Sequence, residues 1–334
     1  MGLLADDRRL RAPQEHRVRR EAELGIIARS SAMQRLLQEV RRYARADANV
    51  LITGETGAGK DLVADALHRW GPRRTLPFVK IDCASMPASL MEAELFGFER
   101  GAFTDAAAAK AGRFELAGAG TVYLDGVSEL PLDMQGKLLR AVEDKRVERL
   151  GGATSIEVRA RFIASAADGI ERSVREGTFR DDLFHRLRVL PLHVPPLRER
   201  RADILPLARH FLKAACATAR REPAKFTKSA QDLLMRYQWP GNVRELRHTV
   251  DRAILDLDHG AKEIAPGNLP IDLVAHPATY QGSGPADRPT LEELERRYIE
   301  LVLRETRGKQ TQAARLLGIS RKALWEKRKK YGLE

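Results

Sequence analysis

The sequence predicts an α/β fold built on a parallel sheet, followed by helical segments and a small all-α unit. Short apolar runs alternate with helical stretches up to residue 195, as a βαβ architecture requires. The runs are apolar almost throughout, which suits a parallel sheet buried on both faces. Beyond them the pattern is helical, and a segment rich in Pro and Gly separates the last helical unit.

The predicted elements divide the chain into five parts. The strands are residues 49–53, 78–82, 121–125, 161–165 and 189–194. Helical stretches lie between them, for example 60–70 and 132–144, and others follow at 203–221, 228–237 and 243–257. The parts are a charged N-terminal tail (1–24), an α/β subdomain (25–195), a helical lid subdomain (196–275), a linker (276–289) and a C-terminal helical domain (290–334).

Composition and charge narrow the class of protein. The net charge of +12 fits a polyanionic partner but says nothing about the fold. Cys83 and Cys216 cannot form a disulfide framework, so we interpret them as buried or inert thiols in a reducing compartment. No apolar run approaches the roughly 20 residues of a membrane-spanning helix, and the N-terminus lacks the apolar core of a secretory signal. We therefore expect a cytoplasmic protein with no membrane partner.

A glycine-rich loop follows the first predicted strand and precedes a helix. It fits the pattern G-x-x-x-x-G-K with the residues Gly54, Glu55, Thr56, Gly57, Ala58, Gly59 and Lys60. In such a P-loop, backbone N–H groups and a helix N-terminus cradle the phosphates, and the lysine reaches the β- and γ-phosphates. A glycine-rich turn with an exposed lysine is the plain alternative, but strand, loop and helix all agree with a nucleotide site. Asp61 stands where the generic motif has a Ser or Thr ligand of Mg²⁺.

A carboxylate ends the third predicted strand. The run Thr-Val-Tyr-Leu leads directly to Asp125. A carboxylate at the end of a buried strand beside a P-loop suits a Mg²⁺ site. An ordinary strand-end aspartate is the alternative, and it is the weaker one once the P-loop is present. The sequence therefore predicts ATP and Mg²⁺ as ligands, with Asp125 holding the metal.

The C-terminal domain has the pattern helix, turn, helix. Ala314 and Leu317 are predicted to face a core, Gly318 allows a left-handed turn, and Ser320 caps the next helix. Residues 307–331 hold nine Lys or Arg and one acid, which concentrates most of the net charge in one place. Such a patch indicates DNA binding, although a basic solvated helix without a ligand is the alternative. The predicted DNA-contacting residues are Thr311, Gln312, Ser320, Arg321, Lys322, Lys327 and Arg328.

Several longer motifs give a specific resemblance. They are Glu94-Leu-Phe-Gly-Phe-Glu-Arg-Gly-Ala-Phe-Thr-Asp-Ala106, Phe179-Arg-Asp-Asp-Leu-Phe-His-Arg-Leu187, Pro195-Pro-Leu-Arg-Glu-Arg200 and Trp239-Pro-Gly-Asn-Val-Arg-Glu-Leu246. Over residues 25–334 the chain resembles the NtrC-like bacterial enhancer-binding proteins, the AAA+ activators of sigma-54 RNA polymerase. Many members also carry an N-terminal sensory domain, for which residues 1–24 leave no room.

The resemblance implies roles and partners. Lys60 would contact phosphate, Asp125 would hold Mg²⁺, and Arg244 matches the lid arginine called sensor II. Arg180 and Arg186 match arginines that reach a neighbour's ATP in a ring, usually a hexamer; interface ion pairs without chemistry are the alternative. The loop Gly101, Ala102, Phe103, Thr104, Asp105 and Ala106 would contact sigma-54 in the RNA polymerase holoenzyme.

The C-terminal domain also resembles the Fis-type domain that ends many enhancer-binding proteins. Leu291, Leu294, Tyr298, Leu301 and Val302 recur at helical spacing and match the first helix of such a domain. In Fis-like domains that helix pairs two subunits. The resemblance therefore implies a homodimer on DNA, with a hexameric ring as a further possible assembly of the AAA+ domain.

The departures from the family pattern concentrate on hydrolysis. Gly126 replaces the Glu that polarises the attacking water, Asp82 replaces an Asn coupled to that Glu, and Ala167 replaces the sensor I Asn. Asp105 also replaces a glycine of the sigma-contacting loop. Three hypotheses follow: a sigma-54 activator with slow hydrolysis, a regulator that binds nucleotide without productive turnover and acts with another polymerase form, or a DNA-bound architectural or repressor protein. Steady-state hydrolysis separates the first hypothesis from the other two, and nucleotide-dependent DNA affinity separates the second from the third.

Overall fold

The computed structural model describes residues 25–84, 87–103, 106, 108–258, 260–270 and 309–333, together with residues 292, 295, 296, 298, 299, 302, 303 and 306. The chain divides into two compact units. One contains residues up to Lys225 together with Gln238–Ile264, and the other contains Phe226–Tyr237 and Ala265–Glu334. The predicted tail (1–24), the linker (276–289) and Leu291, Leu294 and Leu301 lie outside the described residues.

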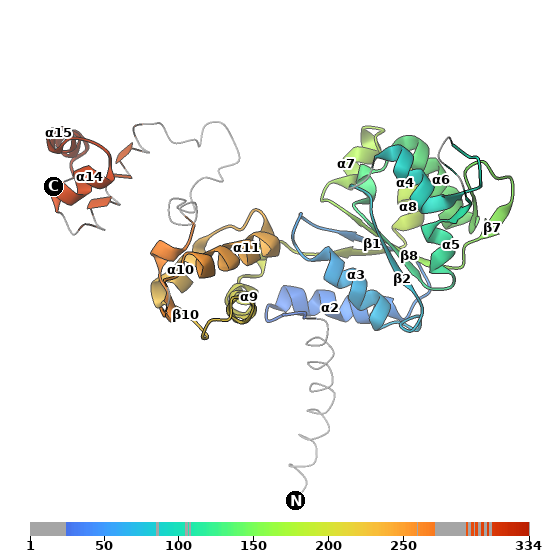
Figure 1. Ribbon diagram of the computed structural model, residues 1–334, viewed down its shortest axis with the longest axis horizontal. Coiled ribbons are helices and arrows are strands. Elements are labelled where there is room, and N and C mark those ends of the chain that lie inside the picture. Colours follow the sequence, from blue (N-terminus) through green and yellow to red (C-terminus); the bar gives the residue numbers. More distant parts are fainter. Residues whose placement is uncertain are drawn as a thin grey trace, which may run out of the picture. The chain divides into compact units, whose positions relative to one another are not determined.

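The first unit contains a five-stranded parallel sheet (Figure 1). Its strands are β1 (Val50–Thr53), β2 (Phe78–Asp82), β5 (Thr121–Asp125), β8 (Arg161–Ala166) and β9 (Leu190–His193), in the order β2-β5-β8-β1-β9. All pairings are parallel, and the register sets Asp82 opposite Asp125. The predicted strands are confirmed to within a residue at each end. The central strand β8 is buried along its length, whereas the edge strands β2 and β9 are partly exposed because each has a neighbour on one side only.

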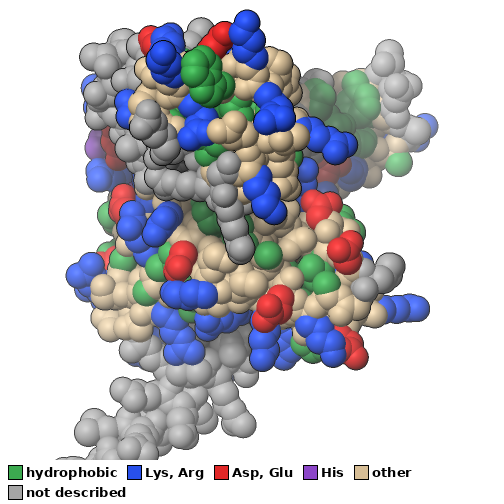
Figure 2. Space-filling view, turned by 90° about the vertical axis from the view of Figure 1, so that its left-hand side faces the viewer, with side chains coloured by type: hydrophobic (Ala, Val, Ile, Leu, Met, Phe, Trp, Pro, Cys, Tyr) green, Lys and Arg blue, Asp and Glu red, His purple; other side chains and the backbone are tan. Residues whose placement is uncertain are grey.

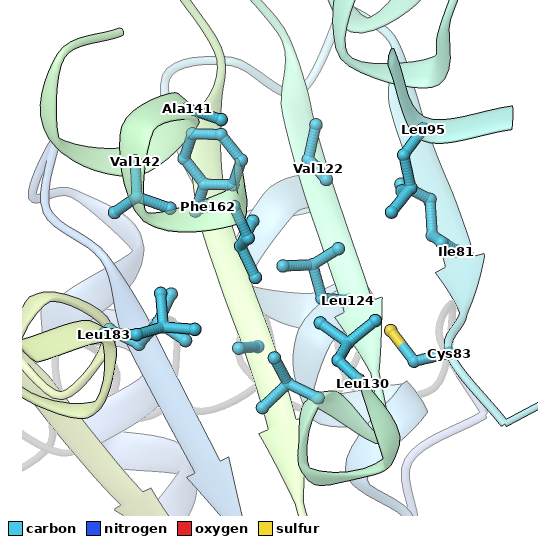
Figure 3. Close-up of a cluster of buried hydrophobic side chains, with 14 of the residues drawn as sticks. Ile81, Cys83, Leu95, Val122, Leu124, Leu130, Ala141, Val142, Phe162 and Leu183 are labelled. Atoms are coloured by element: carbon cyan, nitrogen blue, oxygen red, sulfur yellow. The ribbon is translucent and has the colours of Figure 1, made fainter. Parts of the chain in front are cut away.

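Helices cover both faces of this sheet (Figure 1). On one face, α2 (Ser31–Ala44) and α3 (Lys60–Arg69) pack on a cluster that includes Val50, Ile52 and Ile163. The other face carries α4 (Ala88–Phe96), α5 (Arg113–Ala117), α6 (Leu132–Glu143), α7 (Ile170–Arg175) and α8 (Asp181–Leu187). Figure 3 shows part of this second cluster, where Leu124, Leu130 and Cys83 come together. Two buried faces explain why the strand sequences are apolar rather than alternating.

The helical part that follows contains α9 (Ile204–Thr218), α10 (Lys228–Arg236) and α11 (Asn242–Leu255), after the 3-10 turns η2 (Leu197–Glu199) and η3 (Arg201–Asp203). Helices α9 and α11 pack against each other within the first unit. Among the short strands that were not predicted, β10 (Lys225–Phe226) and β11 (Glu263–Ile264) pair in a region whose sequence reads as purely helical. Two-residue strands are too short to show a periodicity of their own, which explains the error.

The C-terminal unit contains the predicted helix-turn-helix. Helices α14 (Gln310–Leu316) and α15 (Arg321–Tyr331) flank a turn in which Gly318 has a φ of 66°. The Ser320 hydroxyl accepts from the backbone N–H of Ala323 at 3.1 Å, which confirms the predicted N-cap. Ala314 is buried in a cluster with Val302 and Leu324, and Leu317 packs against it.

Two further expectations concern cysteines and membrane spans. Cys83 and Cys216 are both buried, as predicted for inert thiols. Burial, reinforced by the negative charge of Asp125, Asp82 and Glu129, raises the pKa of Cys83 to about 12. Among the helices that the structure describes, none has the length and apolarity needed to span a bilayer.

Candidate functional site

The predicted P-loop joins β1 to α3 in a conformation that requires glycine. Gly54, Gly57 and Gly59 have φ values of 149°, 77° and 103°. A Cβ on Gly57 would lie 2.4 Å from the carbonyl oxygen of Gly241, and a Cβ on Gly54 would lie 2.7 Å from that of Val194. Sterics therefore exclude side chains at both positions while the loop keeps this shape.

Lys60 lies at the first position of α3, where a P-loop lysine meets phosphate. Its Nζ donates to the carbonyl oxygens of Gly54 at 2.6 Å and Glu55 at 3.1 Å. Partial burial lowers the pKa of Lys60, opposed by the negative charges of Asp125, Asp168 and Asp61. The structure thus brings the P-loop lysine, Asp61 and Asp125 together, as predicted.

Arg244, the predicted lid arginine, also approaches the P-loop. It lies at the start of α11 and is exposed. Its positive charge contributes to the lowered pKa of Lys60, and its Cβ would lie 3.1 Å from a Cβ added to Gly57. This lid residue and the phosphate-binding loop are therefore parts of one site.

Asn242 fixes the P-loop from behind and was missed by the sequence reasoning. It is fully buried, and its Nδ2 donates to the Glu55 carboxylate at 3.0 Å and to the Thr56 carbonyl at 3.1 Å. Its Oδ1 accepts from the backbone N–H of Leu197 at 2.7 Å. The Asn242 amide therefore connects the P-loop to the segments Pro195–Arg200 and Trp239–Leu246. In the sequence, only the resemblance of Trp239–Leu246 to a family motif indicated this region.

Two arginines of the segment Pro195–Arg200 complete the attachment. Arg198 donates two hydrogen bonds, at 2.7 and 2.8 Å, to the two carboxylate oxygens of Glu55. This pairing lowers the pKa of Glu55. Arg200 is buried and donates to the Ala58 carbonyl at 2.5 Å. Bidentate arginine pairs are geometrically specific, so they hold the loop in one conformation.

Asp125 ends β5 at the carboxyl edge of the sheet and has partners on both carboxylate oxygens. Oδ1 accepts from the Ser165 hydroxyl at 2.7 Å and from the Tyr123 hydroxyl at 3.1 Å. Oδ2 lies 3.1 Å from the Nζ of Lys80. Lys80, Tyr123 and Ser165 are neighbours of the site that the motifs did not indicate, because each sits within a strand and reads as sheet.

The departures from the family pattern lie beside Asp125. Gly126 adopts a left-handed conformation with φ 75°, and its N–H donates to the Ser165 hydroxyl at 3.0 Å. A Cβ at this position would meet only Glu129, at 3.8 Å. Asp82 is the register partner of Asp125 in the pairing of β2 with β5. Ala167 directly follows β8 and is exposed. Gly126 and Ala167, at two of the positions tied to hydrolysis, carry no hydrogen-bonding side chain.

Arg180 and Arg186 lie apart from this group, on α8. Both are exposed, and they pair with Asp182 and Glu143 respectively. Neither is among the charges that act on Lys60. An exposed position on one protomer is what a residue aimed at a neighbouring subunit would have, and equally what a surface ion pair would have.

The predicted sigma-contacting loop rises from a short hairpin. Strands β3 (Gly97–Phe98) and β4 (Lys110–Ala111) pair at its base. The rings of Phe98 and Phe103 meet edge to face at 4.9 Å, and the N–H of Gly101 donates to the Ala106 carbonyl at 2.9 Å. Phe103 remains 43% exposed. Thr104 and Asp105 lie outside the described residues.

A second hairpin packs beside this loop. It consists of β6 (Arg146–Glu148) and β7 (Ser155–Glu157). The backbone of Glu99 donates to Leu150 at 2.9 Å, and a Cβ on Gly151 would touch the side chain of Ala102 at 3.0 Å. The loop base is therefore supported by backbone contacts, and a neighbouring cavity of about 830 Å³ is lined by both hairpins and α6.

The predicted DNA-contacting residues divide into two groups. Thr311, Gln312, Ser320, Arg321 and Lys322 are exposed. Lys327 instead pairs with Glu295, and Arg328 donates to the Leu333 carbonyl at 2.8 Å. These two side chains therefore stabilise the unit itself, as does the Ser320 hydroxyl that caps α15. Among the described residues, Thr311, Gln312, Arg321 and Lys322 are the predicted contacts whose polar ends are exposed without such a role.

Further exposed groups lie on the recognition helix α15. Trp325 is 56% exposed, and the Lys329 ammonium lies 5.5 Å from its ring centroid. Lys330, by contrast, pairs with Glu292 at 2.8 Å. Lys and Arg side chains are numerous on the face of the molecule that Figure 2 shows.

A parallel sheet with a P-loop, lid helices and a C-terminal helix-turn-helix defines the class of AAA+ transcription regulators. Family models match this chain in three consecutive segments. Residues 26–193 match the sigma-54 interaction domain, residues 198–284 the AAA+ ATPase lid domain, and residues 290–331 the bacterial regulatory protein, Fis family.

Sequence and structure relatives support the same class of protein. The chain is 42% identical to the transcriptional regulatory protein ZraR of Salmonella typhimurium and 41% identical to the DNA-binding transcriptional regulator NtrC of the same species. These matches cover 92% of the chain and 68% and 70% of the relatives. The structures of NtrX from Brucella abortus in complex with ADP and with ATP superpose with TM-scores of 0.70 and 0.71 at 35% and 34% identity, covering 99% of this chain and 74% of NtrX.

The chain therefore belongs to the NtrC-like family of sigma-54-dependent transcriptional regulators, with an AAA+ domain and a Fis-type DNA-binding helix-turn-helix. Nucleotide binding is typical of this family. The sigma-54 interaction domain and the Fis-type domain imply interaction with sigma-54 RNA polymerase and with DNA.

Proposed function

We propose that this regulator binds ATP at the P-loop and hydrolyses it slowly. The proposal of ATP binding rests on the P-loop itself. Its backbone conformation requires glycine, and both Lys60 and Arg244 lie close to it. Asn242 and Arg198 hold the loop in place. Such a cradle offers backbone N–H groups and two cations to the phosphates, once the Lys60 ammonium exchanges the Gly54 and Glu55 carbonyls for phosphate oxygens. The NtrX complexes with ADP and ATP support the same choice of ligand.

The proposal of slow turnover rests on Gly126. A glycine has no side chain with which to orient an attacking water, and general base catalysis contributes typically about 10²–10⁴-fold. Glu129 is the nearest acidic side chain to the position of a Cβ on Gly126, but it lies in the turn after Asp125 and is exposed. Arg180 and Arg186 would meet a neighbour's ATP in a ring, a role that depends on assembly.

The sequence pattern predicts Mg²⁺ beside ATP, with Asp125 as its ligand. The conformation described does not fit a metal there, because Lys80 lies against Asp125 Oδ2 and the Ser165 and Tyr123 hydroxyls occupy Oδ1. No reaction step is therefore assigned to the metal.

The proposed output is transcription from sigma-54 promoters. The loop Gly101–Ala106 would contact sigma-54 in the polymerase holoenzyme, with Phe103 as its exposed aromatic. Exposed residues of α14 and α15 would contact DNA, and a dimer would form through the C-terminal domain, with a possible hexameric ring of AAA+ domains. Cytoplasmic location remains a prediction.

Two measurements on the purified protein test this proposal. We expect calorimetry to show ATP binding that Lys60→Ala abolishes, because Lys60 is the cation that the P-loop itself supplies to the β- and γ-phosphates. Lys228→Ala, which removes an exposed lysine of α10, serves as the control and should bind ATP normally. ATP turnover in the same samples, with and without promoter DNA, should be slow.

The outcomes separate the alternatives. Unchanged ATP affinity in Lys60→Ala would refute the nucleotide site. Robust hydrolysis by the unmodified chain would show that another group has replaced the missing Glu. If the chain bound nucleotide but showed no turnover, and if the nucleotide did not change its affinity for DNA, an architectural or repressor protein would be favoured.

A further inference from the structure

Lys80 occupies an unusual place in the nucleotide site. It lies on β2, opposite Tyr123 in the parallel register between β2 and β5. Its Nζ lies 5.5 Å from the centroid of the Tyr123 ring, which itself stacks with Phe78. A lysine stem resting on an ordered ring has fewer conformations than one in solvent, so its ammonium is directed along the strand toward the carboxyl edge.

The ammonium joins two carboxylates that belong to different motifs. Lys80 Nζ lies 2.5 Å from Asp61 Oδ2 and 3.1 Å from Asp125 Oδ2. Asp61 directly follows the P-loop lysine, in the first turn of α3, and Asp125 ends β5. One lysine thus connects the two positions from which P-loop proteins hold Mg²⁺.

The remaining oxygens of both carboxylates face the same hydroxyl. Tyr123 OH lies 2.9 Å from Asp61 Oδ1 and 3.1 Å from Asp125 Oδ1, and it can donate its proton to only one of them at a time. Ser165 donates to Asp125 Oδ1 as well. The two acids are therefore held close together, and their mutual repulsion is offset by the ammonium between them.

The contacts of Lys80 differ from those of an ordinary surface lysine. An ordinary surface ion pair would have one carboxylate partner and little effect. Lys80 has two, together with an aromatic support, although its side chain is still 42% exposed.

We propose that Lys80 is the resident cation of this site and makes nucleotide binding independent of Mg²⁺. The ammonium neutralises Asp61 and Asp125, which would otherwise repel the phosphates or recruit a divalent metal. This inference rests on the proposed nucleotide binding at the P-loop. It concerns binding only and assigns no step of hydrolysis to Lys80.

The test compares ATP affinity in Mg²⁺ with ATP affinity in EDTA, by calorimetry on the full chain. The unmodified protein should bind with nearly the same affinity in both. Lys80→Met keeps the apolar stem and removes the charge, so its affinity should fall about tenfold or more in EDTA and recover in Mg²⁺. Lys80→Arg keeps the charge and should behave like the unmodified chain.

A matched control and the contrary outcomes complete the design. Lys228→Met removes a lysine that pairs with Asp232 on another helix and should show no metal dependence. If the unmodified chain lost as much affinity in EDTA as Lys80→Met, Lys80 would not be the cation of the site, although the nucleotide site would stand. If the unmodified chain bound no ATP in either buffer, the nucleotide site itself would be refuted, and this inference with it.

Discussion

The P-loop and the carboxyl end of β5 are neighbouring parts of one site, but the first is formed mainly by backbone and the second mainly by side chains. The P-loop is defined by backbone shape: glycines in left-handed or crowded positions, held from behind by Asn242, Arg198 and Arg200. The end of β5 depends on side chains, and there Gly126 and Ala167 offer none that can hydrogen-bond. A binding loop made of backbone can therefore keep its shape where the side chains expected for hydrolysis are absent.

The largest expected effect comes from disturbing the backbone frame. Gly57→Ala would place a Cβ 2.4 Å from the Gly241 carbonyl oxygen, so either the loop or the lid segment must move. We expect a loss of ATP affinity of about 100-fold or more, the scale at which displacements near 1 Å act. Calorimetry measures it. Gly267→Ala, where an added Cβ meets no atom within 4 Å, is the matched control. Equal affinities in the two variants would show that the loop is not rigid.

Restoring a catalytic side chain tests the other half of the comparison. Gly126→Glu, alone and with Asp82→Asn, should raise ATP turnover by about 10²-fold if the missing Glu acts as a general base. The left-handed φ of 75° should cost the variant about 1 kcal/mol of folding stability. Steady-state hydrolysis and thermal unfolding measure the two effects. Unchanged turnover in a folded variant would mean that more than these side chains has been lost.

In the C-terminal unit, some basic side chains pair within the unit and others are exposed, so their substitution should have different effects on DNA binding. Arg321→Ala should relax sequence specificity at a cost of about 1–3 kcal/mol, since the start of a recognition helix meets base edges. Lys329→Ala should lower the salt slope of binding by about one, whereas Lys330→Ala should lower it by less because Lys330 pairs with Glu292.

Affinity measured against salt concentration, on specific and unrelated DNA, checks these values. Deleting residues 290–334 should abolish specific binding and leave ATP binding intact. Specific binding by the truncated chain would place the DNA-binding surface elsewhere, and equal salt slopes for the two lysine variants would contradict the distinction between them.

The smallest expected effect is a dependence of stability on pH. The pairing with Arg198 holds the pKa of Glu55 below its ordinary value of 4.5. A carboxyl whose pKa is lower in the folded state contributes stability that is complete above its unfolded pKa and is lost as pH falls through the folded pKa. Glu55→Gln should therefore remove about 1 kcal/mol or less at neutral pH, and less in acid. Urea unfolding of both proteins at pH 7 and below pH 4.5 measures this; a difference that did not shrink in acid would contradict it.

Local sequence patterns predicted the sheet, the P-loop and the helix-turn-helix because each is encoded by residues close together in the chain. The five strands, the glycine conformations of the P-loop and the Ser320 cap all follow from such patterns. Thr104, Asp105 and most of the first C-terminal helix lie outside the described residues, so those predictions stay predictions.

The contacts that support the site could not be predicted in this way. Asn242 reaches Glu55 across 187 positions of sequence, and Arg198 reaches it across 143. Lys80 was hidden for another reason: on an edge strand a lysine reads as a solvent-facing residue, and only the pairing with β5 shows that it points toward two carboxylates. Knowledge of the fold was needed before these side chains could be connected.

The left-handed backbone at Gly126 has an evolutionary consequence. Any L-amino acid placed there carries a conformational penalty of about 1 kcal/mol or more. A substitution that restored a Glu would therefore raise turnover and lower folding stability in the same step. The backbone at position 126 thus opposes the return of a side chain even where that side chain would be useful.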